Sequence, residues 1–140
     1  MFFCFILFII ISITLFCFNH CPRYKLDQEY IRRIKEYGLM HFTIKENVSS
    51  ILQQGLKPNK KKALCYLERN MVWMYIAEPG CYEEKLREIH SKGKRSSYNA
   101  VIFIHNISDE DINRMRCRKK PEAIIHIGTL KTNCMEAKDA

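Results

Sequence analysis

The sequence predicts an α+β protein with one N-terminal transmembrane helix followed by one small basic domain. All charged residues come after position 22, so the 140-residue chain divides into an uncharged head and a charged body. The body, residues 21–140, is large enough for one hydrophobic core and too short for a second domain. Within it, segments with helical spacing alternate with short apolar runs of strand length.

The predicted membrane anchor occupies residues 1–21. Its apolar run, residues 1–18, has no charge, glycine or proline and is long enough to cross a hydrocarbon core of about 30 Å. A cleaved signal peptide is the alternative, but no Lys or Arg precedes the run and no small residues mark a cleavage point. Five basic residues follow between Arg23 and Lys35, which predicts a cytoplasmic body.

The cysteine pattern and the net charge indicate which disulfides, metal sites and binding partners to expect. The chain has seven cysteines and no Cys-x-x-Cys pair, so a disulfide framework and a zinc site are not indicated, and a reducing compartment fits. The formal charge of +8 indicates an anionic partner, such as lipid, nucleic acid or a nucleotide phosphate. The basic runs at 60–62 and 116–120 contain few aromatic residues, which weakens the case for a nucleic-acid platform.

The elements of the first half of the body are read from apolar spacing and stop signals. Apolar residues at helical spacing over 27–37 predict a helix that ends at Gly38. Residues 39–44 predict a strand. A second helix is expected over 47–54, with Asn47 as its N-cap.

The second half continues the alternation. Strands are predicted over 72–77, 100–104 and 123–127, and helices over 81–91 and 108–117, with a frayed tail from residue 133. Regular alternation alone favours a parallel α/β sheet. However, no glycine-rich phosphate loop follows any predicted strand, which argues against dinucleotide-fold and P-loop nucleotide binding.

The most informative stretch is residues 40–58. Here His41-Phe42-Thr43 on a strand leads into a short helix that closes with Gly55-Leu56 and Pro58. This pattern resembles the opening of ADP-ribosyltransferase-fold proteins, and it is closest to the compact branch that includes DNA-targeting ADP-ribosyltransferase toxins and RNA 2′-phosphotransferases.

The later segments follow the same order as that family. The strand carrying Trp73 and Tyr75 resembles its second core strand, and Glu122 resembles the acidic residue that opens a late strand. The resemblance implies a split β-sandwich over 38–132, with residues 22–37 as a juxtamembrane helix and 133–140 as a tail. The Glu-x-Glu or Gln-x-Glu pair expected of arginine- or asparagine-modifying relatives is absent.

The resemblance also implies roles for individual residues. His41 would bind a ribose hydroxyl of NAD, with Thr43 supporting the ribose or diphosphate on the same face. Trp73 or Tyr75 would offer an aromatic surface to nicotinamide, and His41, Tyr75 and Glu122 would be the catalytic set. Glu122 would stabilise the cation formed as nicotinamide leaves. The diphosphate would be held by basic groups such as Lys45, Arg69 or Arg118.

Each of these residues also has a structural explanation. His41 can be a satisfied core histidine, the two aromatic residues can form one face of a core, and Glu122 can pair with Lys119 or Lys120. Three hypotheses therefore remain at this point. The chain transfers ADP-ribose from NAD to an unknown acceptor, it is an inert tethered module for a nucleotide or nucleic acid, or it is a basic lipid-surface protein.

Overall fold

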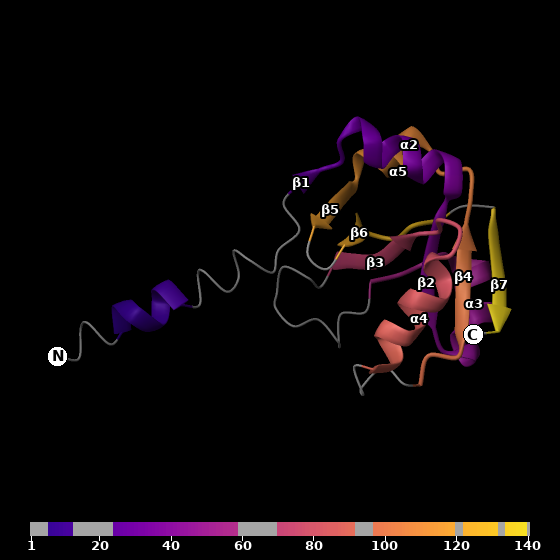
Figure 1. Cartoon of the computed structure of the whole chain (residues 1–140), viewed down its shortest axis with the longest axis horizontal. Coiled ribbons are helices and arrows are strands. Elements are labelled where there is room, and N and C mark those ends of the chain that lie inside the picture. The colour runs from indigo at the N-terminus through magenta and orange to yellow at the C-terminus, as the bar shows by residue number, and fades with distance from the viewer. Residues whose placement is uncertain are drawn as a thin grey trace.

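The chain folds into one antiparallel sheet with helices on both faces (Figure 1). The computed structural model describes residues 6–12, 24–58, 70–91, 97–119, 122–131 and 134–139. The strands are β1 Tyr24–Lys25, β2 Leu39–Thr43, β3 Met71–Ile76, β4 Ala100–Ile104, β5 Met115–Lys119, β6 Glu122–Ile127 and β7 Met135–Asp139. The helices that cover them are α2 Gln28–Tyr37, α3 Lys45–Gln54, α4 Cys81–Ser91 and α5 Asp109–Asn113.

Only part of the predicted anchor falls within the described residues. Residues 6–12 are helical and their side chains are exposed. In the described part of the chain, no helix has both the length and the apolar character needed to cross a membrane. The remainder of residues 1–21 lies outside the described residues.

Among the described residues, the seven strands have the order β1-β5-β6-β3-β2-β4-β7, and every pairing between them is antiparallel. The prediction of an α+β protein is confirmed, and the parallel sheet that simple alternation favours is wrong. Alternation of helices and strands along the chain does not determine which strands become neighbours. β3 and β4, for example, are consecutive in the chain but lie on opposite sides of β2, whose register with β4 extends from Leu39↔Ile104 to Thr43↔Ala100.

Helix α2 shows why the start of the body folds as predicted. The Asp27 side chain accepts a hydrogen bond from the Tyr30 backbone N–H at 2.9 Å, which caps the helix. Gly38 ends it with φ of 78° and lets its N–H reach the Ile34 oxygen. A Cβ at Gly38 would lie 2.5 Å from the Ile104 oxygen, so only glycine lets the chain turn directly from α2 into the sheet.

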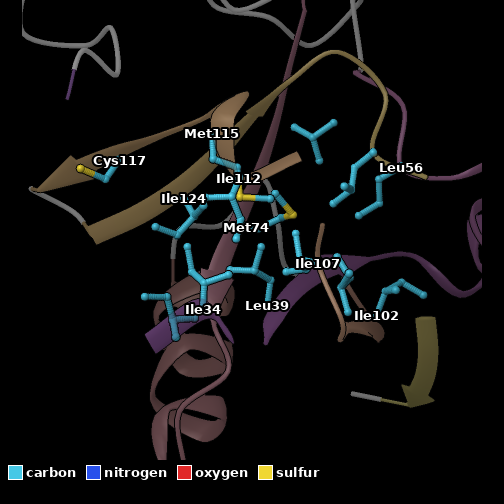
Figure 2. Packing of buried hydrophobic residues seen from close by; sticks show 14 residues of the cluster. Ile34, Leu39, Leu56, Met74, Ile102, Ile107, Ile112, Met115, Cys117 and Ile124 are labelled. Carbon is cyan, nitrogen blue, oxygen red and sulfur yellow. The ribbon is translucent and has the colours of Figure 1, made fainter. Parts of the chain in front are cut away.

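Two apolar clusters fill the space on the two faces of the sheet. The larger packs α2, α3 and α5 against β2, β3, β4, β5 and β6 (Figure 2), and it includes Ile34, Leu39, Met74, Ile112 and Ile124. The smaller packs Ile89 of α4 against Met40, Phe42 and Val101 on the other face. This division follows from the alternation of side chains along β2.

Three local predictions are wrong. α3 begins at Lys45, with Ile44 rather than Asn47 at the N-cap position. The helix that starts after Ser108 ends at Asn113, and the basic run that follows is strand β5. The predicted frayed tail is strand β7, which pairs with β4 along its whole length.

Candidate functional site

The sheet divides between β2 and β3. These strands pair only through Leu39↔Ile76 and Met40↔Tyr75, whereas β2 pairs with β4 through five residue pairs and β3 with β6 through four. Beyond Met40 and Tyr75 the two strands therefore separate, leaving one half of the sheet on the β3 side and the other on the β2 side. His41, Thr43, Trp73 and Tyr75 all belong to the two strands that border this division.

His41 links the two halves at the point of separation. Its Nδ1 lies 2.8 Å from the backbone oxygen of Trp73. Because a carbonyl oxygen only accepts hydrogen bonds, Nδ1 carries the proton and, in the neutral ring, Nε2 is an acceptor. Burial lowers the pKa of His41, and its hydrogen bond to the Trp73 carbonyl opposes that shift only in part. The imidazole is therefore neutral at pH 7.

Thr43 follows His41 on the same face of β2 and is buried. Its backbone oxygen accepts a hydrogen bond from the Asn99 N–H at 3.1 Å, which fixes the end of the strand. Two residues later, Lys45 donates its backbone N–H to the Asn99 side-chain oxygen at 2.7 Å. Asn99 thus holds the turn from β2 into α3.

Tyr75 and Glu122 line one small cavity. Its volume is about 30 Å³, which is room for about one water molecule. It opens where β3 ends and β6 begins, and α2 and α4 complete its wall. The polar side chains that line it are Arg33, Tyr75, Glu78, Cys81, Lys85 and Glu122.

Arg33 joins two carboxylates across this cavity. Its guanidinium donates to Glu78, which follows β3, and to Glu122 at 3.0 Å. The hydrogen bond to Glu78 is the main reason why the pKa of Arg33 is well above its ordinary value, and it lowers the pKa of Glu78. The Arg33 guanidinium therefore lies between two acidic side chains at the cavity.

The cavity has one thiol and one further cation. Burial raises the pKa of Cys81 and the Glu78 charge raises it further, so the thiol is protonated at pH 7 and is a poor nucleophile. The Lys85 ammonium lies 5.5 Å from the centre of the Tyr75 ring, within cation–π range. The Tyr75 ring also meets Phe42 edge to face at 6.0 Å. Tyr75 thus contacts both the cavity and the smaller apolar cluster.

Trp73 lies on the same face of β3 as Tyr75, as strand alternation predicts, but it does not line the cavity. The Arg118 guanidinium lies 5.7 Å from the centre of its ring. Among the other predicted phosphate-binding residues, Lys45 pairs with Asp139 at 2.9 Å on the exposed surface. Arg69 lies outside the described residues.

The structure thus brings together two of the predicted site residues. Tyr75 and Glu122 share the cavity, and Glu122 is the first residue of β6, as expected. His41 and Thr43 do not line it. Sequence reasoning missed Arg33, which is one of several charged residues in its helix, and Glu78, which precedes a Pro-Gly turn, because neither stands in a motif. No group of three or more His, Cys, Asp or Glu that could hold a metal occurs among the described ranges.

Comparisons with known proteins found no relative. No family model matches the chain, no curated protein is significantly similar to it, and no solved structure is significantly similar to its fold. The case for function therefore depends on the residues and the geometry alone.

Proposed function

We propose that this chain is an ADP-ribosyltransferase-like protein that transfers ADP-ribose from NAD to an acceptor. In this proposal the antiparallel sheet is a split β-sandwich of the ADP-ribosyltransferase type, and NAD enters where the sheet divides. The observation that carries the proposal is the cavity that Tyr75 and Glu122 share. The resemblance gives them the roles of the aromatic surface and the carboxylate of such a site, although they are 47 positions apart in the sequence.

The reaction assigns a step to each residue. The bond between C1′ of the ribose and the nicotinamide nitrogen breaks, and nicotinamide leaves with the electron pair. The Glu122 carboxylate stabilises the resulting cation and accepts a hydrogen bond from the ribose 2′-hydroxyl. A nucleophilic atom of the acceptor then bonds to C1′ and releases its proton to solvent. Tyr75 offers its ring to nicotinamide.

The neutral state of His41 agrees with the role given to it. With Nδ1 donating to Trp73, Nε2 of the neutral ring accepts a hydrogen bond from a ribose hydroxyl. An imidazolium would have no acceptor. The burial that lowers the pKa of His41 therefore keeps the ring in the form that this contact requires.

Measurement of nicotinamide release from NAD by the full chain tests the proposal. We expect Glu122→Gln to lower the rate by about 10²- to 10³-fold, because a neutral amide does not stabilise a cation. Glu110→Gln is the matched control, since Glu110 also pairs with an arginine, Arg114, but on the exposed surface of α5. Equal rates for the wild type and Glu122→Gln would contradict the proposed role of Glu122.

One observation favours a second candidate function, an inert module that binds a nucleotide or nucleic acid. Glu122 is already engaged by Arg33, and the cavity is about the size of one water molecule. A module of this kind binds NAD without releasing nicotinamide. Calorimetric titration with NAD, run beside the release assay, separates binding without turnover from transfer.

We further propose that residues 1–21 hold the protein in a membrane with the body on the cytoplasmic side. The support is the uncharged run over 1–18 and the five basic residues that follow it. Protease treatment of intact cells should leave the body uncut, whereas treatment after lysis should cleave it. Cleavage in intact cells would reverse the orientation, and a chain that lacks its first residues would indicate a signal peptide.

A further inference from the structure

Strand β7 lies at one edge of the sheet and carries one acidic and one basic residue on the same face. It pairs with β4 on one side, and no other strand of the described ranges pairs with its outer side. Its exposed residues include Glu136 and Lys138, two positions apart and so on the same face. Edge strands present unpaired backbone groups to other chains, and a lysine on the edge commonly discourages such pairing.

The hydrogen bonds to β4 determine which backbone groups of β7 face outward. The His105 N–H donates to the Cys134 oxygen at 3.0 Å, and these two residues are opposite each other in the register that also pairs Ile104 with Met135. Opposite residues in an antiparallel ladder alternate between hydrogen-bonded and non-hydrogen-bonded pairs. Glu136 and Lys138 therefore direct their backbone groups toward β4. The residues whose N–H and C=O groups face the outer edge are Met135, Ala137 and Asp139.

We propose that β7 pairs antiparallel with β7 of a second copy of this chain, about a two-fold axis through Ala137. In this register Ala137 lies opposite itself, and Met135 lies opposite Asp139 of the second copy. All three positions have outward backbone groups, so each pair is of the hydrogen-bonded type. The ladder of one sheet then continues into the other.

The side-chain charges favour this register over the two registers that are centred one residue to either side. With the axis at Ala137, Glu136 lies opposite Lys138 of the second copy, and Lys138 lies opposite Glu136. These are non-hydrogen-bonded pairs, in which side chains approach most closely. An axis at Glu136 would place two carboxylates opposite each other, and an axis at Lys138 would place two ammonium groups opposite each other. Both alternatives are repulsive.

The size of the contact determines how strong the pairing is. A five-residue edge buries less surface than a standard protein interface. The dimer is therefore weak, its population rises with concentration, and salt weakens it because its two charge pairs are exposed. Its specificity comes from the charge pattern rather than from apolar area.

Carbodiimide cross-linking of the full chain in detergent micelles tests the pairing, because this reagent joins a carboxylate to an amine in contact. Two single variants are used, Glu136→Lys and Lys138→Glu. In a dimer of either variant alone, both cross-strand pairs join residues of the same charge. In a mixed dimer of the two variants, each pair again places a lysine opposite a glutamate. Lys57→Glu is the control, since it makes the same charge change on an exposed residue beyond α3.

We expect cross-linked dimer from the wild type, from Lys57→Glu and from the mixture, and about tenfold less from each single variant alone. Mixing ¹⁴N- and ¹⁵N-labelled wild-type chains should give a mass-spectrometric peptide that joins Glu136 of one isotope to Lys138 of the other. Equal dimer in all samples would overturn the proposal and assign association to another surface. Absence of the mixed-isotope peptide would overturn it as well.

Discussion

The guanidinium of Arg33 in α2 lies 3.0 Å from the carboxylate of Glu122 at the start of β6, 89 positions further along the chain. The same guanidinium binds Glu78, which lies two residues beyond the end of β3. One side chain therefore joins a helix, the end of one strand and the beginning of another at the mouth of the cavity. Its removal leaves two partly buried carboxylates without their cation.

Arg33→Ala should lower the free energy of unfolding by about 1–3 kcal/mol, since both carboxylates lose a charge-assisted hydrogen bond. Chemical denaturation measures the change. Arg32→Ala is the control in the same helix: Arg32 also binds two glutamates, but its side chain is 57% exposed against 21% for Arg33. We expect little change for Arg32→Ala because water screens its ion pairs. Equal losses for the two variants would mean that the Arg33 cluster adds no more than a surface pair.

His41 should make stability depend on pH. Burial places its pKa in the folded state below the ordinary value of 6.5, so the unfolded chain binds more protons in the interval between the two values. The contribution of the neutral ring is complete above pH 6.5 and is lost as the pH falls through that interval. His41→Asn keeps a donor for the Trp73 oxygen without a titrating ring.

Denaturation of the wild type and His41→Asn over pH 5 to 7.5 gives the difference curve, in which other titrating groups cancel. We expect the wild type to lose stability relative to His41→Asn as the pH falls below 6.5. His41→Ala should be less stable than both at pH 7.5, by about 1–3 kcal/mol relative to the wild type, because the part-buried Trp73 carbonyl loses its donor. A flat difference curve would show that the ring is not desolvated.

Two glycines with similar backbone angles should respond differently to alanine. Gly38 has φ of 78° and a Cβ there would meet the Ile104 oxygen at 2.5 Å, whereas Gly80 has φ of 82° and an open surrounding. We expect Gly38→Ala to cost about 2–4 kcal/mol and Gly80→Ala about 1 kcal/mol in unfolding free energy. The difference between the two variants isolates the steric contact. If both cost the same, backbone strain alone would explain the glycine at position 38.

Removal of residues 135–140 should destabilise the domain by at least about 2 kcal/mol, because β4 loses its partner strand. The side chains of Ile102 and Ile104, which are fully buried, belong to that strand. Thermal unfolding followed by circular dichroism measures the effect. An unchanged melting temperature would show that β7 is dispensable for the fold.

Apolar spacing and stop signals were sufficient for several elements. The bounds of α4 and β4 agree with those predicted, and α2 begins one residue later than expected. In these segments the apolar residues recur with one clear spacing, and turn-forming residues stand at the ends. The local sequence is therefore enough to determine where each element begins and ends. β5 shows the opposite case. Met115 and Cys117 are buried on alternate positions between arginines, a strand pattern that the preceding helix cap and the basic charge obscured.

Contacts between distant segments explain the remaining errors. α3 begins before Asn47 because Asn99, far along the chain, binds the Lys45 N–H. β7 is polar and was predicted as a tail, since only its pairing with β4 makes it a strand. The cavity also depends on contacts between distant segments. The resemblance points to Tyr75 and Glu122, but only the folded chain brings Arg33 between Glu78 and Glu122.

The strand order also determines when this domain can form. β1 pairs with β5, so Tyr24 meets Cys117, and the sheet closes on its other side with residues 135–139. Pairings of such long sequence separation make folding slow, because much of the chain must be ordered before they form. During synthesis, the first strands emerge without their neighbours and wait for segments translated later. We therefore expect chaperones to bind the nascent chain until its last strand has left the ribosome.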